Sequence, residues 1–278
     1  MRQDMGELKD QIRESVEYIR KKTKMTPLVG IIFGTGMGAM ADTFEKKVKI
    51  SYQHIPHFPV ATVETHQGFL VFGKIQAKPV VAMQGRFHRY EGYTLREVTF
   101  PVRVMKALGC KYIIITNAVG SMNPLIPSGA LVLIRDHINL MGDNPLIGPN
   151  DDTLGPRFPD MSEPYSRDLI SLAEDVALEN RIRIHKGVAV AVTGPCLETA
   201  AEYRFFRRIG ADIVTMSTIP EVIVAVHAGL KAMGLSTVTD ECLPDALKPA
   251  EIETIIQVAN SQEENRQTII RGIIARLE

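Results

Sequence analysis

Short apolar runs rich in β-branched residues alternate along this chain with segments of helical periodicity, and this alternation limits the fold more than any other feature. The runs, each predicted to be a buried strand, are residues 28–33, 69–72, 80–83, 112–116, 131–134, 187–193 and 235–239. Three Thr-x-x-Glu sequences between the runs match the capping box that begins a helix, and they lie at residues 94–97, 199–202 and 218–221. Because strand and helix alternate, we predict an α/β fold with a largely parallel or mixed sheet and helices on both faces.

Both ends of the chain carry helical patterns. Apolar residues recur at helical spacing in a charged opening segment, so residues 1–26 are predicted to form an amphipathic surface helix. Repeated isoleucines predict a long packing helix over residues 249–278. The segment 142–164 has five prolines and no periodicity, which indicates an ordered functional loop or an oligomer contact. A chain with 45% hydrophobic content is expected to form a single domain over residues 1–278.

Composition argues against several classes of protein. Basic and acidic residues both number 32, so the chain lacks the basic excess of a nucleic-acid-binding protein. No apolar run approaches the roughly 20 residues that span a bilayer, and the opening residues are charged, so we expect a soluble, cytoplasmic protein without a membrane partner. Cys110, Cys196 and Cys242 are too scattered for a disulfide framework or a zinc site, and each is expected to be a small core residue. The histidines and cysteines match no metal motif, so no catalytic metal is expected.

The segment 83–93, MQGRFHRYEGY, indicates an anion pocket. Arg86 directly follows an apolar strand, and the fixed fork of a guanidinium matches phosphate oxygens. A surface arginine is the alternative. His88, Tyr90 and Glu91 lie close behind Arg86, and crowding of titratable groups is typical of functional sites.

Two further elements are of the kind that binds phosphate. The glycine loop GTGMG at residues 34–38 follows a predicted strand, so its amides are able to face an anion, and Thr35 adds a hydroxyl. Ser217 and Thr218 place two hydroxyls where a helix begins. A turn used only for packing is the alternative for the glycine loop. A dinucleotide site is a poor alternative, because it needs an acidic residue about 20 residues further on, and the segment ISYQHIPHF there has none.

Three other polar residues have an ordinary reading beside a functional one. His66 precedes a glycine, and alone it is typical of a solvated loop histidine. Glu198 lies just before a helix cap, where it either stabilises the helix dipole or binds a ligand. Asp240 ends an apolar strand, where α/β sheets bind ligands, although a turn aspartate is the simpler reading.

Taken together, seven segments resemble the trimeric purine nucleoside phosphorylases, in order and over nearly the whole chain. These segments are GTGMG, the HQG at 66–68, GRFHRYEGY, TNAVGSMNP, RFPDM, GPCLETAAE and MSTIPEV. The resemblance implies reversible phosphorolysis of a purine nucleoside, in which inorganic phosphate attacks the ribose C1′ and releases the free base and ribose 1-phosphate. It also implies a single α/β domain around a mixed, barrel-like twisted sheet, a homotrimer, and no cofactor other than phosphate as co-substrate.

The resemblance also implies roles for particular residues. Those expected around phosphate are Thr35, His66, Arg86, His88, Ser217 and the backbone of Ala118. Those expected in the ribose subsite are Tyr90, Met216, Ile252 and, from a neighbouring subunit, Phe158. The base subsite is expected to contain Leu197, Glu198 and Asp240. Catalytic roles then fall to His88, Glu198 and Asp240, with Glu91 supporting His88.

Asp240 departs from the family pattern, because relatives that cleave inosine and guanosine usually carry an asparagine there, whose amide bridges N7 and O6 of the base. A carboxylate accepts from N7–H and from a 6-amino group, but it cannot donate to O6 unless protonated. Glu198 favours 6-oxopurines instead, since N1 of adenine carries no proton and offers an ionised carboxylate no hydrogen bond. An unpaired buried acceptor discriminates by up to about 10⁴-fold. We therefore expect 6-oxopurine nucleosides to be preferred, with adenosine as a second substrate.

A second departure keeps other functions open. Ile252 falls where many relatives place a histidine that contacts the 5′-hydroxyl, and Thr35 replaces the more usual serine. An apolar 5′ pocket would favour a 5′-methylthio group, so the alternative is an S-methyl-5′-thioadenosine phosphorylase. Glu198 argues against it, because those relatives have a small residue there. From a different class, a non-catalytic nucleoside-binding protein would not need the phosphate ligands Arg86 and His88.

Overall fold

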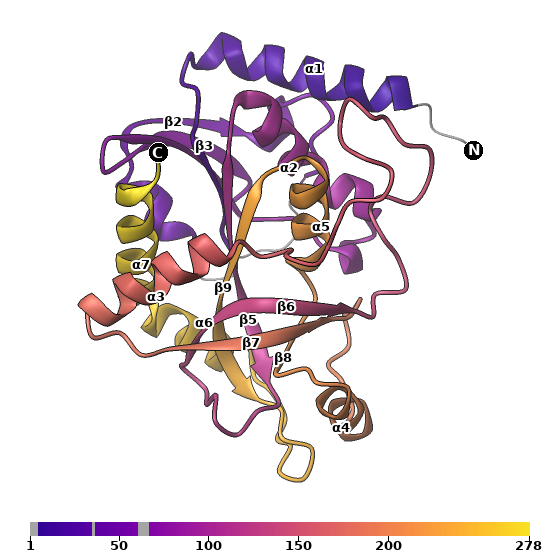
Figure 1. The fold of residues 1–278 in the computed structure, drawn as a ribbon, viewed down its shortest axis with the longest axis vertical. Helices are drawn as coiled ribbons and strands as arrows, with labels where there is room; N and C mark the ends of the chain where they lie inside the picture. Colours follow the sequence, from indigo (N-terminus) through magenta and orange to yellow (C-terminus); the bar gives the residue numbers. More distant parts are fainter. Residues whose placement is uncertain (1–4, 35–36, 61–66) are drawn as a thin grey trace.

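One mixed β-sheet organises the chain, and the computed structural model of the protein describes residues 5–34, 37–60 and 67–278 (Figure 1). Its strands within these residues are β1 (Val29–Ile32), β2 (Glu45–Ser51), β3 (Phe69–Ile75), β4 (Lys78–Gln84), β5 (Tyr112–Ser121), β6 (Leu131–Asn139), β7 (Ile184–Ala191), β8 (Ile213–Thr215) and β9 (Lys231–Glu241). The order in the sheet is β2-β3-β4-β1-β5-β8-β7-β6-β9, and β5 also pairs with β9. The strands β5, β8, β7, β6 and β9 therefore close into a ring, from which β1, β4, β3 and β2 extend. The predicted α/β fold with a mixed, barrel-like sheet is confirmed.

The arrangement of parallel strands determines where a site can form. β1 pairs in parallel with β4 and with β5, and β5 pairs in parallel with β9. The carboxyl ends of β4, β1, β5 and β9 therefore lie at the same edge of the sheet. This edge is where open α/β sheets bind their ligands.

The seven predicted runs each overlap a strand, although the runs 28–33 and 187–193 extend beyond β1 and β7, and the pattern missed β2 and β8. β2 has the sequence EKKVKIS, lies at the edge of the sheet and is largely exposed, so it carries little apolar signal. β8 has only three residues, which is too short for a periodicity to be recognised.

Helices cover the sheet, and most of their contacts join elements that are far apart in the sequence. Within the described residues they are α1 (Met5–Lys22), α2 (Leu95–Leu108), α3 (Arg167–Glu179), α4 (Ala200–Arg208), α5 (Ile219–His227), α6 (Ile252–Ser261) and α7 (Glu263–Arg276), with short 3₁₀ turns at Gly38–Thr43, Tyr52–His54 and Arg89–Glu91. α2 packs against α1 and α5, α3 packs against α7, and α6 packs against β9. None of the helices in the described part of the chain has the length and apolar character needed to cross a membrane.

Two of the three predicted capping boxes form. Thr94 and Thr199 each accept a hydrogen bond from the backbone three residues later, at 3.3 Å, and begin α2 and α4. The capping box predicted at Thr218 is wrong. Thr218 has a φ of 73° and caps no backbone amide, because its hydroxyl and the carboxylate of Glu221 both contact Arg86 instead.

The two ends of the chain form helices of different kinds. In α1, Ile12 and Ile19 are buried on the protein side. The single helix expected over residues 249–278 is instead two helices, because the helix α6 ends before Gln262 and α7 begins after it. The isoleucines of α7 are buried, whereas Ile252, at the start of α6, is 71% exposed.

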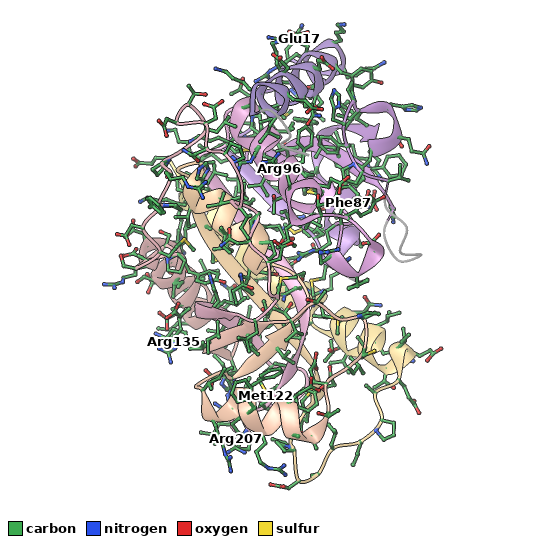
Figure 2. The ribbon with its side chains drawn as sticks, turned by 90° about the vertical axis from the view of Figure 1, so that its right-hand side faces the viewer. Glu17, Phe87, Arg96, Met122, Arg135 and Arg207 are labelled. Carbon is green, nitrogen blue, oxygen red and sulfur yellow. The ribbon has the colours of Figure 1, made fainter. Side chains whose placement is uncertain are left out.

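The hydrophobic core divides into a large and a small cluster. Phe87 belongs to the large cluster and Met122 to the small one, and Figure 2 shows them in different halves of the molecule. Cys110 is buried in the large cluster and Cys242 in the small one, as expected. The expectation is wrong for Cys196, which is exposed in the loop after β7.

The proline-rich segment 142–164 contains no helix or strand and connects β6 to α3. Side chains hold its turns, since Asn150 Nδ2 donates to the carbonyl of Gly155 at 3.0 Å and Asp151 Oδ1 accepts from the amide of Thr153 at 2.8 Å. Hydrogen bonds between its own residues thus order this loop.

Candidate active site

A cavity of about 250 Å³ lies at the carboxyl edge of the parallel strands. Arg86 reaches it from the end of β4, Ala118 and Gly120 from the last part of β5, and Asp240 from the last part of β9. Ser217 lies between β8 and the start of α5. Residues far apart in the sequence meet here because parallel neighbouring strands end together.

The guanidinium of Arg86 is anchored to three elements. Nη1 lies 3.2 Å from Thr218 Oγ1 and 3.5 Å from Glu221 Oε1, both at the start of α5. Nη2 donates to the carbonyl of Ile32 at 3.4 Å and to the carbonyl of Thr116. Arg86 is 1% exposed, and burial lowers its pKa while Glu221 counteracts this. The arginine is thus held rigidly with a buried counter-charge.

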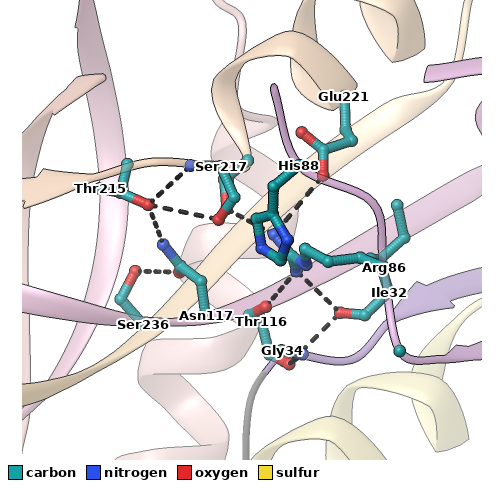
Figure 3. A network of polar contacts seen from close by, with 12 residues as sticks. Ile32, Gly34, Arg86, His88, Thr116, Asn117, Thr215, Ser217, Glu221 and Ser236 are labelled. Carbon is teal, nitrogen blue, oxygen red and sulfur yellow. Dashed lines mark hydrogen bonds and ion pairs between the residues drawn. The ribbon is translucent and has the colours of Figure 1, made fainter. Parts of the chain in front are cut away.

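A chain of hydrogen bonds fixes the hydroxyl of Ser217 (Figure 3). Ser236 Oγ donates to Asn117 Oδ1 at 2.7 Å, and Asn117 Nδ2 donates to Thr215 Oγ1 at 2.9 Å. Thr215 Oγ1 accepts from the amide of Ser217 at 3.2 Å and lies 3.3 Å from its hydroxyl. All four side chains are buried, so the network orients Ser217 before any ligand binds.

The backbone at Thr218 is strained. Its φ of 73° and ψ of −52° are those of a classic γ-turn, and the amide of Ile219 donates to the carbonyl of Ser217 at 2.8 Å. Such a conformation costs a β-branched residue on the order of 1–3 kcal/mol and is typical of functional sites. Ser217, the residue before Thr218, lines the cavity at the start of α5, where a helix N-terminus favours an anion.

The glycine loop begins at Gly34, whose amide donates to Thr116 Oγ1 at 3.2 Å. A Cβ at this position would lie 2.8 Å from the carbonyl oxygen of Thr116, so only glycine allows this approach. The predicted phosphate ligands Thr35 and His66 lie outside the described residues.

His88 is oriented by Glu91. The amide of His88 donates to Glu91 Oε1 at 2.8 Å, and Nδ1 lies 2.8 Å from the same oxygen, which identifies Nδ1 as the protonated nitrogen. The ring of His88 stacks on Tyr90 with centroids 4.6 Å apart. Burial raises the pKa of Tyr90 to about 12, with a further contribution from Glu91. Tyr90 therefore remains a neutral hydroxyl beside the histidine.

Glu198 presents spare hydrogen-bonding capacity to the cavity. Its Oε1 is buried and has no hydrogen-bond partner among the described residues. Burial raises the pKa of this carboxyl, and the hydroxyl of Tyr203 partly offsets the effect. A buried acceptor without a partner is costly, so the arrangement favours a ligand that brings a donor.

Asp240 is aimed into the cavity by an irregularity of β9. The pairing shifts between Val119 and Gly120, so that Val119 pairs with Val238 but Gly120 pairs with Asp240. Such a bulge re-aims a side chain. Asp240 Oδ1 accepts from Thr239 Oγ1 at 2.8 Å.

The cavity brings together most of the predicted site residues, namely Arg86, His88, Tyr90, Ala118, Leu197, Glu198, Met216, Ser217 and Asp240. Two other predicted site residues, Ile252 and Phe158, do not line this cavity. Ile252 is 71% exposed and outside this cavity, which Ile255 of the same helix lines instead, because the first turn of α6 faces outward. Phe158 is 87% exposed and lines a separate cavity of about 430 Å³ beside Ile147.

Several lining residues were missed by the sequence reasoning, including Asn117, Tyr203, Thr215 and Ile255. Asn117 alone carried a signal, since a polar residue inside an apolar strand run needs a buried partner. Within the described residues no group of three or more histidine, cysteine, aspartate or glutamate side chains is arranged to hold a metal ion.

The fold and the cavity together define an α/β protein with a polar cavity at the strand ends, lined by a buried arginine and by the carboxylates of Glu198 and Asp240. A family model described as "Phosphorylase superfamily" matches residues 29–275, and the chain belongs to this family. Purine nucleoside phosphorylase 1 of Bacillus subtilis is 48% identical to it, over 98% of this chain and 100% of the relative.

Solved structures give the same result. A Schistosoma purine nucleoside phosphorylase in complex with hypoxanthine has a TM-score of 0.92 and 41% identity, covering 97% of this chain and 98% of that one. The Schistosoma mansoni purine nucleoside phosphorylase in complex with adenosine has a TM-score of 0.92 and 39% identity, with the same coverage.

Proposed function

We propose that this protein is a purine nucleoside phosphorylase, which catalyses the reversible phosphorolysis of purine ribo- and deoxyribonucleosides to the free base and (deoxy)ribose 1-phosphate. One observation carries the proposal: a single cavity is lined by a buried guanidinium and hydroxyls, which we assign to a phosphate end, and by two carboxylates, which we assign to a base end. The hypoxanthine and adenosine bound by its structural relatives support a purine as the base.

At the phosphate end, Arg86, His88, Ser217 and the backbone of Ala118 bind inorganic phosphate. Thr35 and His66 complete this set by resemblance. Phosphate is already a nucleophile, so it needs orientation, partial desolvation and charge pairing, and no general base to create it. The fixed hydroxyl of Ser217 and the strained turn at Thr218 supply orientation before phosphate arrives.

At the base end, Glu198 accepts hydrogen bonds from N1–H and from any 2-amino group of a 6-oxopurine. The unpartnered, buried Oε1 supports this role, because the base supplies the missing donor. A hydrogen bond to a charged group is worth roughly 1.5–3 kcal/mol. Inosine and guanosine are therefore the preferred substrates, and Leu197 adds apolar contact to the base.

Asp240 accepts from N7–H and so stabilises the leaving base. It also accepts from a 6-amino group, which makes adenosine a second substrate. The adenosine complex of the Schistosoma mansoni relative is consistent with this extension.

The ribose lies between the two ends, against Tyr90 and Met216. Met216 is polarisable and uncharged, and an oxocarbenium-like sugar tolerates such a neighbour. Phe158 is exposed in its own subunit, which supports its proposed place in the ribose subsite of an adjacent subunit. We propose a cytoplasmic homotrimer active in purine salvage, with phosphate as co-substrate and without a metal or organic cofactor.

A direct assay tests the proposal. The protein is mixed with inosine, adenosine or S-methyl-5′-thioadenosine, with and without phosphate, and the free base is followed by chromatography. Release of hypoxanthine only with phosphate is expected. Release of adenine only from the methylthio substrate would instead favour the methylthioadenosine phosphorylase, and binding of inosine without turnover would favour the non-catalytic binder.

A further inference from the structure

Asp240 is held from two sides by residues that follow it and precede it in the chain. Thr239 Oγ1 donates to Oδ1 at 2.8 Å, and Cys242 Sγ donates to Oδ2 at 3.0 Å. Thr239 has one hydroxyl proton, and its oxygen also lies 3.3 Å from the carbonyl of Val119. The hydroxyl therefore divides its proton between two acceptors, which leaves the thiol as the steadier donor.

The thiol is fixed in place. The amide of Cys242 donates to the carbonyl of Ser121 at 2.7 Å, which ties the residue to β5. Cys242 is 2% exposed and packs in the small hydrophobic cluster beside Tyr203 and Phe206. Cys242 also lines a second cavity, of about 610 Å³, beside Tyr203 and Asp240, and its low exposure and its backbone hydrogen bond keep the thiol against the carboxylate.

β5 leaves the space in which the thiol and the carboxylate meet. A Cβ at Gly120 would lie 2.5 Å from Cys242 Sγ and 3.1 Å from Asp240 Oδ2. Gly120 is also the residue at which the pairing of β5 with β9 shifts. The glycine, the bulge and the thiol thus converge on one carboxylate oxygen.

We propose that Cys242 is a positioning residue that holds the Asp240 carboxylate as a pure acceptor, and that it thereby biases the base subsite toward purines with a hydrogen-bond donor at position 6. The thiol lies outside the lining of the main cavity, so it acts through Asp240. Its proton occupies one lone pair of Oδ2 and fixes the plane of the group. A proton on Asp240, which donation to O6 of an oxopurine would need, competes with that contact. This inference rests on the proposed function.

The test compares kcat/KM for adenosine and inosine in the wild type, Cys242→Ala and Cys242→Ser. The adenosine-to-inosine ratio is expected to fall roughly three- to ten-fold in Cys242→Ala, the size of one lost hydrogen bond from a weak donor. Cys242→Ser keeps a donor and should retain the ratio. Val190→Ala is the matched packing control, because Val190 lies in the same small cluster and its apolar side chain cannot hydrogen-bond to Asp240. It should lower Tm and leave the ratio unchanged.

A double-variant cycle tests whether Cys242 changes the adenosine-to-inosine ratio through Asp240. In an Asp240→Asn background, Cys242→Ala should change the ratio no further, since no carboxylate remains to be positioned. A shift that persists in that background, or a ratio in Cys242→Ala equal to that of Val190→Ala, would overturn the proposal. So would a wild type that cleaves inosine but not adenosine. Absence of phosphate-dependent turnover with every nucleoside would instead remove the proposed function itself.

An infrared measurement covers the case in which Cys242→Ala does not fold. The difference spectrum between the wild type and Asp240→Asn should show the S–H stretch of Cys242 at lower frequency in the wild type, as expected for a thiol that donates to a carboxylate. An S–H band at the same position in both proteins would refute the contact.

Discussion

The two ends of the cavity are built in different ways. At the phosphate end, Arg86 and Ser217 are buried and bonded to neighbouring strands and to the start of α5. At the base end, Glu198 and Asp240 are half-buried, and Glu198 keeps a buried oxygen that no described residue satisfies. Side chains that are fixed in advance suit a ligand that is always the same, whereas a spare acceptor at the cavity suits a part of the substrate that varies. Changes at the phosphate end should therefore weaken all substrates alike, and changes at the base end should alter their ranking.

The largest effect is expected from Arg86→Gln, which tests the uniformity of the phosphate end. Loss of the guanidinium should lower kcat/KM by roughly 10³-fold for inosine and adenosine alike, because both use the same phosphate. The variant also leaves Glu221 buried without its counter-charge, which should cost about 3–5 kcal/mol of stability. Steady-state kinetics and urea unfolding measure the two effects.

A paired variant separates folding from activity at Arg86. In Arg86→Gln with Glu221→Gln, neither side chain is ionised, so most of the lost stability should return while activity stays low. If activity returned together with stability, Arg86 would be a structural residue and not a phosphate ligand.

The next effect concerns the protonation of His227. This residue is the last of α5, the helix that begins beside Ser217 at the phosphate end. His227 is 3% exposed, its Nδ1 lies 3.3 Å from Arg103 Nη1, and its Nε2 lies 3.3 Å from Asn150 Oδ1. Burial, reinforced by Arg103 and Arg157, lowers the pKa of His227 to about 4. An unfolded histidine titrates near about 6.5, so the unfolded chain binds the proton more tightly.

Stability from this neutral histidine is fully present above pH 6.5 and is lost as pH falls toward 4. The loss should be on the order of 3 kcal/mol at about pH 4, and it should also loosen the loop 142–164 that Asn150 tethers. Urea unfolding of the wild type and His227→Gln across this range isolates the term, since other groups cancel in the difference. Parallel pH curves for the two proteins would contradict the assignment.

Much of the fold could be predicted from the sequence because the buried strands of a parallel sheet are continuous apolar runs. β5 and β9 are of this kind, whereas β2 is charged and lies at the sheet edge. The capping box at Thr218 failed for another reason. Its local sequence is correct for a cap, but the contact of Arg86 with Thr218 and Glu221 comes from another part of the chain and overrides it.

The candidate site was predictable only in part. Arg86 and Asp240 follow apolar strands, so their place at the carboxyl edge could be inferred from the chain alone. The partners of these residues could not, since the contact between Cys242 and Asp240 depends on a bulge and on the absence of a side chain at Gly120. Ile252 was assigned because it falls where many relatives place a histidine, but the side chain is exposed at the start of α6.

A smaller and selective effect is expected at the base end from Glu198→Gln. The amide still accepts from N1–H, but without the charge, so kcat/KM for inosine should fall roughly 10- to 100-fold. Adenosine should lose much less, because the new amide donates to the unprotonated N1 of adenine. Kinetics with both nucleosides and with guanosine measure the change, and Glu202→Gln, at an exposed helix cap, is a matched control. If kcat/KM fell equally for all three nucleosides, Glu198 would not discriminate between bases.

The smallest effect, and the one that most directly distinguishes the two ends, is expected from Asp240→Asn. The amide can donate to O6 and still accept from N7–H, so the preference for inosine over adenosine should rise by about ten-fold, the size of one hydrogen bond. The affinity for phosphate should stay the same, since the change lies at the opposite end of the cavity from Arg86. The substitution keeps the size of the side chain, and the amide oxygen can still accept from Thr239, whereas Cys242 loses the second carboxylate oxygen to which it donates. Phosphate saturation curves at fixed inosine, measured beside the nucleoside ratio, test both halves of the expectation. A shift in the KM for phosphate without a change in the ratio would mean that Asp240 supports the phosphate end, and the division of the cavity into a uniform and a selective end would fail.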